Sequence, residues 1–145
     1  MQGSREPCTC CTHTHTHTYA CTQTAVSDLY DFNAHYFEHH EVGKAGQKAQ
    51  DVEKKMKETV SLLDSLQDSL PKVQYLSLKG RALNISTEYS REAEECLSKA
   101  VKHDPTLGEA WCALGETYWK AGNVQQAHDC FTGSLAHVRF TLDIL

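Results

Sequence analysis

A repeat of 34 residues is the feature that most constrains the fold of this chain. Ala93 and Ala127 are 34 positions apart, and so are Leu97 and Phe131. A period of this length accommodates two short helices and their connections, and stacked units of this kind bury a shared core. The sequence therefore predicts an all-α fold in which helical hairpins form a partial right-handed solenoid.

The second unit carries a spaced pattern that resembles the tetratricopeptide repeat. WCALGETY begins at Trp111 and fits W-x-x-L-G-x-x-Y, and A-x-x-x-F follows at Ala127. We expect the pattern residues to be scaffold rather than ligand contacts, because a repeat must bury its face against a neighbour. They are Gly80, Ala93, Leu97, Ala100 and Pro105 in the first repeat and Trp111, Leu114, Gly115, Tyr118, Ala127 and Phe131 in the second.

Apolar residues at steps of three and four predict six helices from Ser27 onward. The expected segments are 27–40, 45–70, 72–83, 91–103, one starting near 107 and one capped by Asn123. Thr106 and Glu109 have the spacing of a capping box, as do Asn123 and Gln126. Gly122 is expected to close the fifth helix in the left-handed conformation.

Composition divides the chain into five parts. We expect 1–26 to be a disordered low-complexity head, 27–71 an N-terminal helix pair, 72–105 and 106–139 two repeats, and 140–145 a divergent tail. The second repeat has Arg139 where Pro105 closes the first. We expect the last helix to expose apolar surface, because no successor covers it.

The head contains CTCCTHTHTHTYACT, which suggests a metal site. In an extended chain alternate residues share a face, so three imidazoles could point the same way and thiols could complete four ligands. However, zinc frameworks space paired ligands by two or more residues, and here the intervals are one or zero. We therefore predict no structural metal, only weak binding as in a His-tag. The residues concerned are His13, His15, His17, Cys8, Cys10, Cys11 and Cys21.

The same stretch has a second explanation in the genetic code. Every residue from Cys11 to Thr22 can be encoded by strictly alternating pyrimidine and purine bases. Such alternation is typical of a simple genomic repeat. We hypothesise that residues 1–26 are translated repeat DNA joined to a genuine exon. A metal-binding or redox head on a helical scaffold is the alternative function.

A peptide ligand would lie on the first helix of each repeat, along the concave surface. Arg81, Trp119 and Lys120 combine an aromatic ring with cations, which suits an extended peptide with an acidic side chain or terminus. Alternatively, Trp119 packs on the neighbouring repeat. The register predicts as concave residues Gln74, Ser77, Arg81, Asn84, Glu109, Cys112, Glu116, Trp119 and Lys120.

The remaining composition argues against other classes of function. The formal charge of −5 does not favour nucleic-acid binding, and no apolar run approaches the roughly 20 residues that span a bilayer. There is no secretory leader pattern, so we expect free thiols. We see no nucleophile with a base and no phosphate loop, and we therefore predict neither an enzyme nor a cofactor.

KGRALNISTEYS and KAVKHDPTLGEAWCALGETYWK resemble a stress-responsive branch of the tetratricopeptide-repeat family. The resemblance implies a scaffold of nucleus and cytoplasm, with a longer repeat array and an oligonucleotide-binding-type barrel beyond this chain. It implies two kinds of partner, namely transcriptional coactivators of the DNA-damage response and nascent tubulin, whose recognition at the ribosome triggers tubulin mRNA decay. For this segment we expect protein or peptide partners, no membrane and no direct nucleic-acid binding.

Overall fold

A computed structural model describes residues 15–143, with side chains described for 18–137. Within residues 15–143 every regular element is helical, which confirms the predicted all-α class. The elements are α1 (His15–Ala34), α2 (Tyr36–His39), η2 (Val42–Lys44), α3 (Ala45–Ser65), η3 (Gln67–Ser69), α4 (Lys72–Leu83), α5 (Arg91–His103), α6 (Gly108–Lys120) and α7 (Val124–Asp143).

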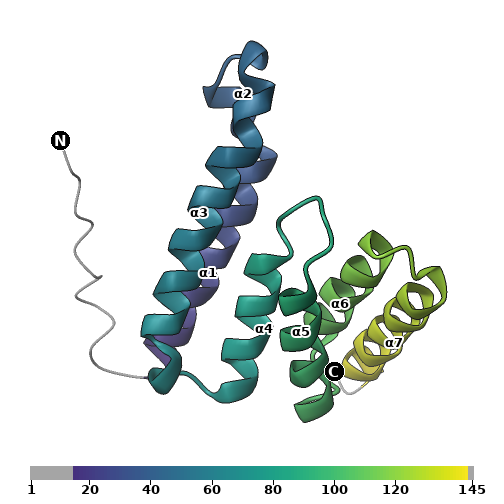
Figure 1. Ribbon diagram of the computed structural model, residues 1–145. Helices are drawn as coiled ribbons and strands as arrows, with labels where there is room; N and C mark the ends of the chain where they lie inside the picture. The colour runs from purple at the N-terminus through teal and green to yellow at the C-terminus, as the bar shows by residue number, and fades with distance from the viewer. Residues whose placement is uncertain (1–14, 144–145) are drawn as a thin grey trace.

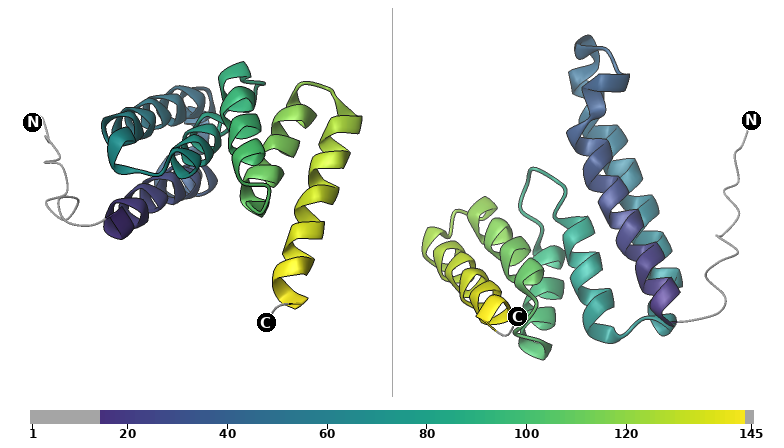
Figure 2. Two further views of the ribbon diagram at one scale, coloured as in Figure 1. Left: turned by 90° about the horizontal axis from the view of Figure 1, so that it is seen from below. Right: turned by 180° about the vertical axis from the view of Figure 1, so that it is seen from behind.

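The helices form three hairpins that stack side by side. The long α1 and α3 run antiparallel and extend well beyond the other helices, with α2 at their tip (Figure 1). The pairs α4–α5 and α6–α7 are the two predicted repeats, and they follow in order away from the long hairpin. Figure 2 shows α7 at the far end of this stack, with α5 and α6 between it and α4.

The expected disordered head at 1–26 is wrong for residues 15–26, which form the first half of α1. Thr18, Thr22 and Val26 recur every four residues and are 2%, 0% and 0% exposed. The hydroxyl of Thr22 donates to the carbonyl of Thr18 at 3.0 Å. A threonine bonded to the preceding turn keeps its hydroxyl satisfied, so it can occupy a buried helical position.

The helix boundaries of the first repeat were predicted correctly, and the differences lie elsewhere. The helix expected over 45–70 ends at Ser65 and gives way to η3, and the one expected over 27–40 is interrupted at His35. Gly122 has φ +80°, and the side-chain oxygen of Asn123 accepts from the backbone N–H of Gln126 at 3.3 Å. Those two predictions are confirmed.

The capping box predicted at Thr106 is wrong. The hydroxyl of Thr106 donates to the carboxylate of Asp104 at 2.5 Å, and α6 begins only at Gly108. The Asp104 carboxylate also accepts from the backbone N–H of Thr106 at 3.0 Å. These hydrogen bonds from Thr106 lower the pKa of Asp104. Leu107, whose side chain has no acceptor, therefore stands at the cap position of α6.

The last helix also departs from the predicted division at 139. α7 continues without a break to Asp143, through the start of the expected tail. α5 instead ends at His103, two residues before Pro105. A proline disfavours helical conformation in the residue before it, and Arg139 imposes no such restriction.

Two glycines set the separation of the paired helices. A Cβ atom on Gly80 would lie 2.5 Å from Cγ of Leu97, and one on Gly115 would lie 2.7 Å from Cε1 of Phe131. Both distances are shorter than real contacts allow. In both pairs the small residue of one helix receives the large side chain of its partner.

A charged cluster attaches the long hairpin to the first repeat. Nζ of Lys79 lies 3.3 Å from the Asp64 carboxylate of α3 and 3.4 Å from the Glu92 carboxylate of α5. The hydroxyl of Tyr75 donates to the same Asp64 at 2.5 Å. Although burial acts against the charged form, hydrogen bonds with Tyr75 and Asp64 raise the pKa of Lys79 overall. One lysine thereby connects three helices.

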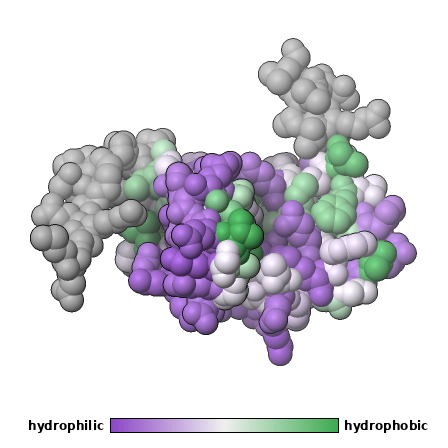
Figure 3. Space-filling view, turned by 90° about the horizontal axis from the view of Figure 1, so that it is seen from above, coloured by the Kyte–Doolittle hydropathy of each residue, from purple (hydrophilic) through white to green (hydrophobic). Residues whose placement is uncertain are grey.

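Apolar surface is exposed on the last hairpin. Val124 and Leu135 of α7 are 59% and 66% exposed. Figure 3 shows apolar surface gathered beside the C-terminal end of the chain, on a face that is otherwise largely hydrophilic. Exposed apolar side chains on α7 are what we expected for this helix. None of the described helices combines the length and apolar character needed to cross a bilayer.

We predict that Gly80→Ala destabilises the chain. The added methyl group would overlap Leu97, and the overpacking should exceed the gain in helix propensity of about 1 kcal/mol, for a net loss of roughly 1–2 kcal/mol. Urea unfolding measures the change. Gly133→Ala is the control, because its methyl group would meet Trp111 at an ordinary 3.6 Å. Equal stability of the two variants would contradict the assigned role of Gly80.

We predict that Thr22→Lys lowers the free energy of unfolding by roughly 3–5 kcal/mol, because it buries an unpaired charge. Thr24→Lys is the matched control, since Thr24 is exposed and makes the same hydrogen bond to the preceding turn, at 2.9 Å. Urea unfolding followed by circular dichroism compares them. A small, equal effect at both positions would show that the start of α1 is not part of the core.

Candidate functional site

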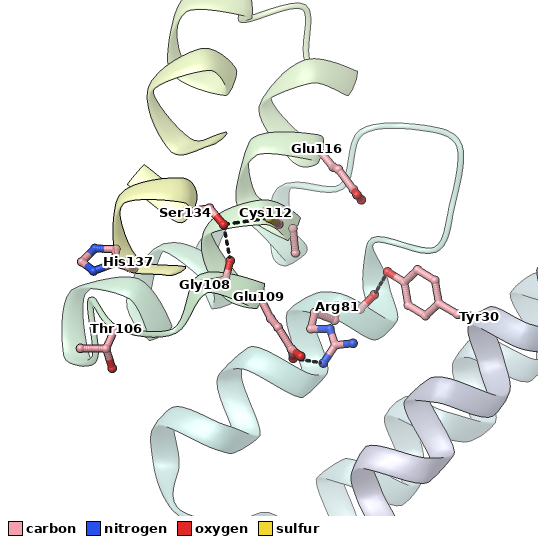
Figure 4. Close-up of a pocket in the computed structure, with 10 residues that line it drawn as sticks. Tyr30, Arg81, Thr106, Gly108, Glu109, Cys112, Glu116, Ser134 and His137 are labelled. Carbon is pink, nitrogen blue, oxygen red and sulfur yellow. Dashed lines mark hydrogen bonds and ion pairs between the residues drawn. The ribbon is translucent and has the colours of Figure 1, made fainter. Parts of the chain in front are cut away.

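Two adjoining hollows lie on the inner face of the first helices of the repeats. The larger has a volume of about 510 Å³ and is bounded by α1, α4, α6 and α7 (Figure 4). Its lining residues are Tyr30, Arg81, Thr106, Gly108, Glu109, Cys112, Ala113, Glu116, Ser134 and His137. We call it the outer chamber.

The smaller and more enclosed hollow has a volume of about 290 Å³, and we call it the inner chamber. It lies between α1, α4 and the start of α6. Its lining residues are Tyr19, Gln23, Gln74, Ser77, Leu78, Arg81, Thr106, Leu107, Gly108 and Glu109. The chambers share Arg81, Thr106, Gly108 and Glu109, so they adjoin, and we call the two together the trough.

An ion pair stands where the chambers meet. Nη1 of Arg81 donates to Oε2 of Glu109 at 2.9 Å, and the Arg81 side chain is only 20% exposed. The backbone carbonyl of Arg81 accepts from the hydroxyl of Tyr30 at 2.7 Å. Figure 4 shows these groups converging from α1, α4 and α6. The charge of Arg81 is therefore already compensated inside the chain.

The trough lining carries more negative than positive charge. Its carboxylates are Glu109 and Glu116, and Arg81 is its one cation that is charged at all ordinary pH values. Burial, then the nearby charge of Glu116, raises the pKa of Tyr30 to about 12, while Arg81 acts in the opposite direction. The tyrosine therefore stays protonated and serves as a donor.

Lys120, predicted as a groove cation, lies outside both chambers. Its Nζ donates to the carbonyl of Asn84 at 2.6 Å, to the Asn84 side-chain oxygen at 2.9 Å and to the carbonyl of Ser86 at 2.8 Å. Burial lowers its pKa. Lys120 thus fastens the end of α4 and the loop that follows.

Asn84, also predicted for the concave surface, is a buried part of the interface between repeats. It is 3% exposed, and its amide donates to the Glu116 carboxylate at 3.1 Å and to the carbonyl of Ala113 at 3.4 Å. Its oxygen accepts from the hydroxyl of Thr117 at 3.2 Å. Every hydrogen-bonding group of this amide is occupied by α6.

Trp119 lies on the surface of the described part of the chain. The indole is 63% exposed, so it is not packed between repeats, and it lines neither chamber. The six other predicted concave residues do line the trough. They are Gln74, Ser77, Arg81, Glu109, Cys112 and Glu116.

Sequence reasoning missed the wall that α1 contributes. Tyr19, Gln23 and Tyr30 are spaced by four and seven residues, which places them on one helical face. That spacing was readable, but we had assigned the first two residues to the disordered head. Thr106, Ser134 and His137 were also missed, and they reach the trough only through the packing of α6 and α7.

The thiol of Cys112 is the most reactive type of group in the outer chamber. Its Sγ lies 3.0 Å from Oγ of Ser134, and that hydroxyl donates to the carbonyl of Gly108 at 3.1 Å. These contacts orient the two side chains without supplying a base. The trough therefore offers hydrogen-bonding and charged groups for binding.

The residues weighed as metal ligands fall mainly beyond what the structure describes. Cys8, Cys10, Cys11 and His13 lie outside residues 15–143, and the side chains of His15 and His17 lie outside the described side chains. Cys21 is a partly buried thiol of α1. Within the described part of the chain, no three His, Cys, Asp or Glu side chains are grouped to hold a metal.

Comparison with known proteins identifies relatives of the chain. No family model matches it. It is 51% identical to tetratricopeptide repeat protein 5 of Homo sapiens over 118 residues, which make up 81% of this chain and 27% of that protein. The proteins of the same name from Mus musculus and Bos taurus are 49% and 48% identical over the same shares.

The chain spans about a quarter of the length of these curated relatives. Their name agrees with the paired helices and with the glycine contacts described above, both of which the 34-residue repeat predicted. The chain therefore belongs to the tetratricopeptide-repeat proteins and is related to tetratricopeptide repeat protein 5.

Proposed function

We propose that the chain is a non-enzymatic interaction module that binds an extended segment of a partner protein in the trough. The observation that supports this most is that the two chambers adjoin along α4 and α6. Repeat arrays use such concave surfaces to bind partners. An extended peptide could place successive side chains in the two chambers while its backbone meets the polar groups at their rim.

The chemistry of the lining supports binding rather than turnover. The Cys112 thiol has Ser134 as its hydrogen-bonding neighbour, and a hydroxyl is too weak a base to generate a thiolate. The two carboxylates are engaged by Arg81 and by Asn84. Each group thus has a partner within the fold that orients it toward a fixed binding surface.

We further propose, from the resemblance to tetratricopeptide repeat protein 5, the partners and compartments in which this module works. The partners are transcriptional coactivators of the stress and DNA-damage response and nascent tubulin at the ribosome. Recognition of nascent tubulin would lead to decay of tubulin mRNA. The proposed locations are the nucleus and the cytoplasm. Sequence identity of about 50% over 81% of the chain supports these assignments.

We predict that peptides selected on this chain require an open trough. Random twelve-residue peptides displayed on phage would be selected against the immobilised full chain, and the best ones tested by fluorescence anisotropy. Cys112→Trp fills the outer chamber and should weaken binding at least about tenfold, which corresponds to 1.4 kcal/mol. Lys57→Trp, on the exposed face of α3, is the matched control.

Both variants must unfold at the same urea concentration as the parent chain for the comparison to count. Peptides that bind Cys112→Trp as well as Lys57→Trp would place recognition elsewhere. Failure to select any specific peptide would contradict the proposed function. The partner assignment has its own test, in which stalled ribosomes bearing a tubulin N-terminus should retain the chain on sedimentation and ribosomes bearing an unrelated nascent chain should not.

A further inference from the structure

Gln23, which lines the inner chamber, carries a buried acceptor that lacks a donor. Among the described side chains, Oε1 of Gln23 is the one buried nitrogen or oxygen atom without a hydrogen-bonding partner. The side chain lines the inner chamber from α1, opposite Gln74 and Ser77 of α4. An unmet buried acceptor is unfavourable for the folded chain, so this position is suited to an N–H or O–H group supplied from outside.

The charges beside this acceptor indicate the kind of donor. Glu109 borders both chambers, and its partner Arg81 offsets its charge. The Glu116 carboxylate of the outer chamber accepts from the neutral Asn84 amide and also interacts with the charge of Lys120, which lies outside both chambers. The lining itself therefore holds two carboxylates against the one guanidinium of Arg81. A second carboxylate entering the trough would have to displace Glu109 from Arg81 and would also face Glu116.

We propose that the inner chamber receives the cationic head of an arginine or lysine side chain from the bound peptide, with Gln23 as a specificity-determining residue. This inference rests on the proposed peptide-binding function and adds the class of side chain. Guanidinium and ammonium groups carry only donors, so they can serve Oε1 of Gln23 and the exposed Glu109 carboxylate at once. A cationic side chain thus replaces the acidic ligand that the sequence had suggested, because Arg81 already pairs with Glu109 and Lys120 already donates to the carbonyl of Asn84.

The test is a titration of the full 15N-labelled chain with three small probes. These are the N-acetyl, N-methylamide derivatives of arginine, glutamine and glutamate. The arginine probe should shift the side-chain amide signals of Gln23 and the backbone amides of its chamber. Its affinity should exceed that of the glutamate probe at least about tenfold, because one is attracted and the other repelled by the lining.

Two variants separate ligand binding from folding. Gln23→Met keeps the length of the side chain and removes the acceptor, so it should weaken arginine binding several-fold without lowering the urea midpoint. Glu109→Gln should weaken arginine binding and strengthen glutamate binding, since it frees Arg81. Gln47→Met, at an exposed position of α3, is the control and should change neither arginine binding nor glutamate binding.

Each outcome decides the inference. Selective arginine binding that is lost in Gln23→Met and Glu109→Gln supports it. Preference for the glutamate probe overturns it, as does equal binding of the glutamine and arginine probes. If no probe binds while selected peptides still require an open Cys112 site, the cationic inference fails and the proposed function stands. If neither probes nor selected peptides bind, both fail.

Discussion

The close approach of paired helices at Gly80 and Gly115 is the contact on which the rest of the structure depends. Leu97 and Phe131 occupy the space that a Cβ atom would fill, so α5 and α7 press against the backs of α4 and α6. With their outer sides covered in this way, α4 and α6 keep their inner faces open. The trough is a direct result, because polar side chains at these inner positions are not needed for the core.

The long hairpin completes the trough rather than merely preceding the repeats. Lys79 joins α3 to both helices of the first repeat, and the hydroxyl of Tyr30 bonds the last turn of α4. These contacts place α1 across the open side of α4. A solenoid usually needs about three units to bury a continuous core, and the hairpin of α1 and α3 serves as the first of three here.

Sequence predicted most reliably what local spacing determines. The bounds of α4 and α5, the left-handed Gly122 and the cap at Asn123 all follow from residues within a few positions of one another. The first half of α1 was missed because its buried stripe contains threonines, and the hydroxyl of Thr22 is satisfied by carbonyl groups of the helix itself. A search for hydrophobic periodicity does not count buried threonines as core residues. The alternation of His with Thr also resembles the two-residue period of an extended chain.

Six of the nine residues expected on the concave surface line the trough, but their chemistry was misjudged. Gln74, Ser77 and Cys112 line the trough as their positions required. The partners that neutralise Arg81 and engage Lys120 come from 28 to 36 residues away in the chain. Contacts of that separation depend on how the repeats stack, and a single sequence contains no direct signal for them.

The burial of Asn84 also bears on covalent modification. Asn84, Ile85 and Ser86 form the N-x-S triplet that glycosylating enzymes recognise. A glycan would be attached through the amide nitrogen, which in the folded chain donates to Ala113 and Glu116 and is enclosed between α4 and α6. Lys120 also donates hydrogen bonds to the backbone carbonyls of Asn84 and Ser86, within the triplet. Folding therefore closes this triplet to sugar attachment, and a chain glycosylated there before folding could not bring its two repeats together.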